Sequence, residues 1–449
     1  MRYRNIILLT ILMITSISCG DLLNPQPVDL ITDDQVLKDA NSARVVLSDA
    51  YRNLALLGAP KIVAGDLTAD NLIHNGTFTQ YREISNKDMS SSNGSADALW
   101  SVIYSMSYVV NFLYEGLPAL NLPENDYNEL TAAASFLRAY AYFTGAYTYG
   151  GLPIVTSTDV ETNRSIPRST LEETLDFVEE DLLYALDKLP EEGFNSGEAT
   201  NGAVKALLAK FYLYKKDWQK AESFATDVIE GNGTMTYILE ENFVDALEDF
   251  SSESILEIVY SANDNPGTST DFSINNLFVG RREIIPSSEM VLALQNDGGD
   301  RLAVIDFNGT FARGADNGWT VVRYGPFTNI PVFRLAEIFL IRAEARAQQD
   351  KFAGQNSAES DINTIRQRAG VPLIQGTSKN QMLQVIENER RMELCFEGNR
   401  WYDLVRTGRD QDVMSDFTNN WTDKDKLWPI PLSDVTNNPA LKNAQNPGY

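Results

Sequence analysis

The feature that most constrains the fold is a pair of helical patterns joined by a short turn between residues 201 and 230. Small and large apolar residues recur every three or four positions on both sides of Lys216 and Asp217. That spacing is typical of a helix with one buried face. Small residues let paired helices approach closely, and large ones fill the space between them. The sequence therefore predicts a helix–turn–helix unit.

Similar periodicity extends over much of the chain. It predicts further helices over residues 39–57, 98–117, 128–149, 170–189, 330–349, 358–370 and 379–397. The 201–230 unit is similar to a tetratricopeptide repeat, and the other pairs follow that pattern loosely. We expect a mostly α-helical protein built from degenerate tetratricopeptide-like helix pairs, with an irregular lobe that contains loops and β-strands.

Two regions lack this periodicity. Residues 61–97 are rich in Asn, Ser, Asp and Gly, and predict a long surface loop. Residues 232–329 have a similar composition, with β-like runs at Ser254–Tyr260 and Trp319–Tyr324, and predict an irregular inserted lobe. Residues 35–231 and 330–449 then form the two helical parts, and residues 427–449 an extended terminal strap.

The first residues have the pattern of an export signal. Arg2 and Arg4 precede an apolar run at residues 6–14, which is too short to span a bilayer, and Cys19 follows small residues. This is similar to a bacterial lipoprotein signal, with residues 1–18 removed and Cys19 acylated. Residues 19–34 then predict a tether. The alternative is an ordinary cleaved signal with an incidental cysteine.

Composition excludes several kinds of chemistry. The net charge is −25, which argues against a nucleic-acid partner because phosphate binding needs a basic face. The single histidine, His74, excludes a histidine-rich zinc site, and the two cysteines form no Cys-x-x-Cys pair. No nucleotide-binding glycine-rich loop is present. We therefore expect no cofactor and no histidine-rich metal site. A pair of carboxylates is not excluded by composition, because Asp and Glu total 62, although that abundance is not evidence of a glycosidase.

The two irregular regions contain the residues best suited to binding a sugar. Aromatic rings stack on the apolar face of a sugar, while amides, carboxylates and arginines bond its hydroxyls. We expect one ligand-binding face made of Trp319, Tyr324, Tyr81, Arg82, Asp70 and Asn71. The alternative for each is a loop residue that caps a turn or fills a small core.

Four segments resemble the SusD/RagB family of outer-membrane nutrient-binding lipoproteins from Bacteroidota. They are FLRAYAYFTGAYTYGGLPIV (136–155), PVFRLAEIFLIRAEARAQ (331–348), ENERRMELCFEGNRWYDLVRTG (387–408) and LWPIPLSDVTNNPALKNAQNPGY (427–449). Each is ordinary alone, whereas their order and spacing are specific.

The resemblance implies a surface-exposed, lipid-anchored outer-membrane protein without enzyme activity. It would capture an oligosaccharide and deliver it to a SusC-like TonB-dependent transporter. Two alternatives remain: uptake of peptides, as in RagB-like relatives, and a structural repeat scaffold without a small ligand.

Overall fold

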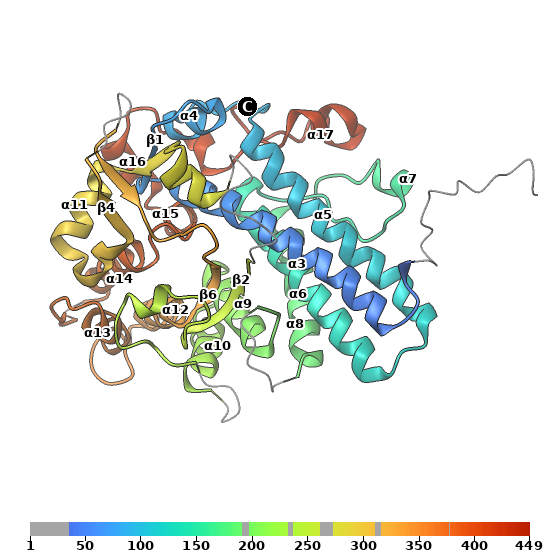
Figure 1. The fold of residues 1–449 in the computed structure, drawn as a ribbon, viewed down its shortest axis with the longest axis horizontal. Helices are drawn as coiled ribbons and strands as arrows, with labels where there is room; N and C mark the ends of the chain where they lie inside the picture. The colour runs from blue at the N-terminus through green and yellow to red at the C-terminus, as the bar shows by residue number, and fades with distance from the viewer. Residues whose placement is uncertain (1–35, 191–196, 232–236, 261–272, 310–315, 377) are drawn as a thin grey trace, which may run out of the picture.

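Paired helices make up most of the computed structural model, which describes residues 36–190, 197–231, 237–260, 273–309, 316–376 and 378–449 (Figure 1). The α-helices are α3 (Ala40–Ile62), α4 (Thr79–Asn86), α5 (Gly94–Gly116), α6 (Glu124–Tyr149), α7 (Val160–Asn163), α8 (Leu171–Lys188), α9 (Asn201–Tyr214), α10 (Trp218–Glu230), α11 (Ser288–Asp297), α12 (Leu335–Gln348), α13 (Ala358–Arg368), α14 (Lys379–Glu393), α15 (Arg400–Thr407), α16 (Asp410–Phe417) and α17 (Leu432–Asn437). The expected mostly helical fold is confirmed.

Helix α6 is the centre of the N-terminal half. It packs against α3, α5 and α8, and is buried almost all round from Leu130 to Tyr149. A helix that is apolar on every side is stable only inside a core. The sequence also predicted where α8 begins. The Thr170 side chain accepts a hydrogen bond from the backbone N–H of Glu173, and the Glu173 side chain accepts one from the backbone N–H of Thr170, so a capping box begins this helix.

The C-terminal half continues the stack. Helices α9 and α10 pack together, α10 packs on α12, and α12 packs on α13 and α14. A second apolar cluster fills the space among α12, α13 and α14, with Ala336, Leu340, Ile362 and Ile386 inside. Figure 1 shows these helices beside the diagonal layer of α3 and α5.

Six short strands form three antiparallel pairs in the described residues. They are β1 (Leu72–His74), β2 (Ser254–Ile258), β3 (Ile284–Pro286), β4 (Ile305–Phe307), β5 (Trp319–Val321) and β6 (Ile330–Arg334). Strand β1 pairs with β3, β2 with β6, and β4 with β5. The β1–β3 pair matters most, because it joins the two regions that the sequence left without helices.

Short helical turns complete the description. They are the π turns η1 (Val63–Leu67) and η4 (Asn276–Gly280), and the 3₁₀ turns η2 (Leu117–Leu120), η3 (Asp245–Leu247), η5 (Gly299–Val304), η6 (Asp423–Lys426) and η7 (Pro439–Leu441).

The structure corrects the prediction of a surface loop over residues 61–97. Helix α3 continues to Ile62, η1 is buried throughout, and β1 and α4 follow. Helix α3 also passes through Pro60, which lies beyond the predicted end of this helix at residue 57. Proline leaves the carbonyl four residues earlier without a donor. That residue is Leu56, which is exposed, so water can supply the donor.

Two smaller corrections concern the C-terminal part. Residues 330–334 form β6 before α12 begins, whereas a continuous helix was expected. The strand is held by its pairing with β2, a long-range contact that local periodicity does not reveal. The terminal strap contains a helical segment, α17, within its otherwise irregular path.

Candidate ligand-binding site

The most accessible aromatic pair lies on the hairpin formed by β4 and β5. Phe307 and Trp319 are opposite each other in the register, with ring centroids 5.4 Å apart and planes inclined by 55°. Phe307 is 52% exposed and Trp319 is half-buried. Cross-strand partners lie on one face of a hairpin, so the two rings form a small aromatic surface.

A buried arginine fixes the backbone under this pair. The guanidinium of Arg282 donates to Asp316 (2.7 Å), to the carbonyl of Trp319 (3.2 Å) and to the hydroxyl of Thr320. Asn317 donates to the carbonyl of Pro286 (2.9 Å), which ties β5 to β3. Because a buried charge needs its partners, Arg282 fixes the backbone that carries Trp319.

The segment after β1 lies beside this hairpin. The Asn75 side chain donates to the carbonyl of Arg282 (2.9 Å). The carboxylate of Glu283 accepts from the backbone N–H groups of Thr77 (2.6 Å) and Phe78 (2.9 Å). The guanidinium of Arg281 lies 4.4 Å from the centre of the Phe78 ring, a cation–π contact. We call the pair of Phe307 and Trp319, together with the pair of Phe78 and Arg281, the aromatic face, because Arg282 and Glu283 connect their segments by hydrogen bonds.

Asp70 and Asn71, predicted at the ligand face, are buried instead. The carboxylate of Asp70 forms ion pairs with Arg400 at 2.8 Å and with Arg391 at 2.9 Å. The side-chain oxygen of Asn71 accepts a hydrogen bond from Arg391 at 3.0 Å. Burial alone would raise the pKa of Asp70, but attraction to the two arginines outweighs it and lowers the pKa. Both side chains join η1 to the 387–408 stretch, so the structure corrects their predicted exposure.

The two predicted tyrosines are also buried. The hydroxyl of Tyr324 donates to the carbonyl of Phe396 at 2.9 Å, and its ring stacks on Phe278. Tyr81 packs inward beside Phe78, with ring centroids 5.9 Å apart. Both rings serve the core in this structure, because their flat faces are covered by protein. Of the six predicted residues, Arg82 is exposed and Trp319 is half-buried. Cys19 lies outside the described residues.

The sequence analysis missed Phe307, Phe78 and Arg281 at this site. Phe307 precedes Asn308 and Gly309, a turn-like composition similar to the one that drew attention to Trp319. That signal was present, but only the β4–β5 register shows that the two rings meet.

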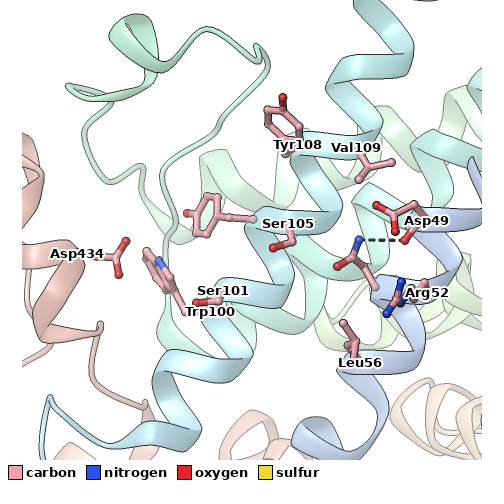
Figure 2. A pocket seen from close by; sticks show the side chains of 11 residues that line it. Asp49, Arg52, Leu56, Trp100, Ser101, Ser105, Tyr108, Val109 and Asp434 are labelled. Atoms are coloured by element: carbon pink, nitrogen blue, oxygen red, sulfur yellow. Dashed lines mark hydrogen bonds between the residues drawn. The ribbon is translucent and has the colours of Figure 1, made fainter. Parts of the chain in front are cut away.

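A second accessible site is a groove of about 650 Å³ between α3 and α5 (Figure 2). The Tyr104 hydroxyl donates to the carbonyl of Pro153, its ring packs on Trp100, and Tyr108 is 53% exposed. Asp434 reaches the groove from α17, and burial raises its pKa. The groove combines rings, hydroxyls and carboxylates, so it is the alternative place for a sugar.

The described residues carry little that suggests metal or membrane-spanning roles. Across them, His, Cys, Asp and Glu never gather in threes in a way that could hold a metal ion. The described helices also include none with the length and hydropathy needed to cross a bilayer.

Comparison with known proteins places this geometry in context. Residues 311–449 match a model described as the SusD family, and residues 58–213 match one described as "Starch-binding associating with outer membrane". SusD-like protein P2 of Formosa agariphila is 24% identical, over 98% of each chain. The starch-binding protein SusD of Bacteroides thetaiotaomicron is 37% identical over 28% of this chain and 22% of its own.

Solved structures agree on the fold. A laminarin-binding SusD-like protein superposes with a TM-score of 0.79 at 23% identity, covering 92% of this chain and all of the other. A putative sugar-binding protein from Bacteroides vulgatus gives 0.78 at 24% identity, with 92% and 99% covered. The two family models lie in different halves of the chain, and the relatives extend along its length. The chain therefore belongs to the SusD/RagB family.

Proposed function

We propose that this protein binds an oligosaccharide at the aromatic face, without catalysis, and delivers it to a TonB-dependent outer-membrane transporter. The observation that carries the proposal is the ring pair of exposed Phe307 and half-buried Trp319 on a hairpin fixed by Arg282. An aromatic pair held in place before the ligand arrives loses little side-chain freedom on binding.

The physical mechanism is stacking with a few hydrogen bonds. The two rings would contact the apolar faces of neighbouring sugar units, while Arg82 and Arg281 would donate to hydroxyl groups. Each contact is weak, since the hydroxyls must give up bound water. Several sugar units on one chain would raise the overall affinity through effective concentration.

Two relatives support the ligand class. One is named as binding starch and another as binding laminarin. Starch and laminarin are both polymers of glucose. Peptide uptake and a scaffold role without a ligand are the competing proposals. A peptide would need backbone donors and acceptors along a groove, in place of exposed ring faces.

Calorimetric titration of the purified chain tests the proposal. The panel contains malto-oligosaccharides, laminari-oligosaccharides, uncharged oligosaccharides of other linkage, and short peptides. We expect heat with at least one oligosaccharide, and about tenfold weaker binding by Trp319→Ala, roughly 1.4 kcal/mol. Phe307→Ala is a second variant at an exposed position, which keeps the test valid if Trp319→Ala folds poorly.

The matched control is Tyr108→Ala, which removes an equally exposed ring from the groove in Figure 2. Loss of sugar binding in this variant alone would move the site to the groove and contradict the aromatic face. Heat with peptides only would favour peptide uptake, and no heat across the panel would favour the scaffold.

The delivery step has its own test. We propose that the protein is anchored through Cys19 and stays bound to the transporter, in line with a family model described as associating with the outer membrane. Purification from detergent-extracted outer membranes should then recover a TonB-dependent transporter with the wild-type chain. Recovery of the chain alone under mild conditions would contradict this partner.

A further inference from the structure

A third hollow, of about 500 Å³, lies among α9, α10, α12, α14 and α15. It shares no lining residue with the aromatic face or with the groove between α3 and α5. Its volume is within the range of about 300–1,000 Å³ typical of ligand pockets. We call it the helical-repeat pocket.

The floor of the pocket contains an arginine that is incompletely satisfied. Arg390 is 3% exposed, and its Nε and Nη2 donate to Asp403 at 2.8 and 3.2 Å. Its Nη1 has no hydrogen-bond partner among the described residues. A buried donor without an acceptor costs free energy, of the order of 1–3 kcal/mol. An acceptor supplied by a ligand would recover it.

The acids that line the pocket are already engaged. The carboxylate of Glu344 accepts hydrogen bonds from both terminal nitrogens of Arg406, at 2.6 and 2.7 Å. Asp403 forms ion pairs with both Arg390 and Arg406, and Glu387 forms one with Arg409 at 3.0 Å. These carboxylates therefore do not compete for an additional cation, and the pocket does not favour a cationic ligand.

The rim adds a free positive charge. Lys216 lines the pocket, is exposed, and forms no ion pair or hydrogen bond through its side chain in the described part of the chain. Lys216 and Arg390 line the same pocket, and their charged donors are complementary to a carboxylate.

The remaining wall distinguishes a peptide from an acidic sugar. Leu383 and Trp218 are half-buried and supply apolar surface, and the buried side chains of Leu213 and Ile386 lie behind them. Aliphatic side chains offer nothing to sugar hydroxyls, whereas they match the aliphatic side chains of a peptide. Side-chain amides of Gln348, Asn380 and Gln384 can pair with a peptide backbone.

We infer that the helical-repeat pocket binds a carboxylate-bearing peptide segment of a protein partner. Lys216 and Arg390 would donate hydrogen bonds to its carboxylate. The inference is independent of the sugar-binding proposal. The probe is a randomised library of acetylated hexapeptides with free carboxylates, retained on the immobilised full-length chain and measured by mass spectrometry. A matched library has amidated ends and no Asp or Glu.

We expect Lys216→Asn to reduce retention of the carboxylate library about tenfold, the effect of one lost charge-assisted hydrogen bond. Lys216 has φ of +61°, a conformation that asparagine tolerates, so the variant should fold. Lys442→Asn, at an exposed lysine outside the pocket, is the matched control and should retain the library as the wild type does.

Three results would overturn the inference. Equal retention by the wild type and both variants would show that Lys216 contacts no ligand. Equal retention of the two libraries would exclude carboxylate recognition. Binding of oligogalacturonate that is lost in Lys216→Asn, with no peptide retained, would assign the pocket to an acidic sugar.

Discussion

Asp66 is a buried carboxyl that links the N-terminal half of the chain to the C-terminal half by hydrogen bonds. One of its oxygens accepts from the Asn71 side chain at 2.7 Å, and the other from the backbone N–H of Gly398 at 2.6 Å. Burial raises the pKa of Asp66 to about 7, although both hydrogen bonds favour the charged form. The folded chain therefore keeps a proton that the unfolded chain loses at much lower pH.

This difference predicts a pH dependence of stability. Below the ordinary carboxyl pKa both states are protonated, and the stabilising contribution of neutral Asp66 is complete. As pH rises toward 7, only the unfolded state has lost its proton, so the free energy of unfolding falls by up to about 1.4 kcal/mol per pH unit. Urea titrations between pH 4.5 and 7 should show this slope reduced in Asp66→Asn.

The control for that measurement is Asp49→Asn, at an exposed carboxylate of α3, which should keep the wild-type slope. Lys87 does not interfere in this window. Burial lowers the pKa of Lys87 to about 7. The folded state therefore binds fewer protons than the unfolded state only above pH 7, and Lys87 makes the free energy of unfolding increase with pH only there, outside the measured range. Identical slopes in the wild type and Asp66→Asn would contradict the assignment to Asp66.

The local sequence predicted the exposure of the Trp319 side chain better than that of Asp70, because the surroundings of Trp319 are local in sequence. Trp319 lies among short polar residues, and its partial exposure follows from that local setting. Asp70 has a similar setting, but its partners Arg391 and Arg400 lie more than 300 residues away in the sequence. Composition cannot show such partners, so a buried ion network was interpreted as a polar surface loop.

Helices followed from the sequence because their signal is local. Those predicted at 98–117 and 201–230 appear as α5 and as α9 with α10, with small differences at their ends. Strand β6 and the η1 turn were missed. Strand β6 depends on pairing with distant β2, and η1 is buried by its contact with α15.

Two glycines allow that contact between η1 and the turn before α15. A Cβ added at Gly65 would lie 2.2 Å from the carbonyl carbon and oxygen of Gly398, well inside contact distance. Gly398 itself has φ of +75°, and a Cβ there would lie 2.6 Å from the carbonyl oxygen of Lys61. The two backbones therefore touch directly, which no other residue pair would permit.

Gly65→Ala should accordingly destabilise the protein by about 1–3 kcal/mol, because the added methyl group forces two backbone segments apart. Gly94→Ala is the matched control at the start of α5, where an added Cβ meets nothing within 4 Å. That change should be neutral or stabilising by about 0.4–1 kcal/mol. Chemical denaturation of both variants measures the difference, and equal stabilities would refute the close packing.

At the scale of the whole molecule, the C-terminal strap joins both halves. The backbone N–H of Trp428 donates to the carbonyl of Thr148 at 2.7 Å, and its indole N–H donates to Thr68 at 3.1 Å. Its ring stacks on Trp401, with centroids 5.9 Å apart. The Asn446 side chain donates to the carbonyl of Tyr149 at 2.9 Å. The last residues thus connect α6, η1 and α15 in one folded unit.

The charge of the whole molecule bears on how it is held at a membrane. A net charge of −25 repels anionic lipid headgroups, so electrostatic attraction would not retain the chain there. An acyl chain contributes about 0.8 kcal/mol for each buried methylene group, which is enough for firm anchoring when several chains are attached. Of the two cysteines, Cys395 is buried and inaccessible for acylation.

Cys19→Ala should therefore abolish labelling by palmitate and move the protein from the membrane fraction to the soluble fraction of expressing cells. Its affinity for oligosaccharide in calorimetry should not change, because the aromatic face lies in the folded body. Cys395→Ala is the matched control, and it should keep both the label and the membrane location. Membrane retention of unlabelled Cys19→Ala would mean that contacts with a membrane partner, rather than the lipid, hold the protein in place.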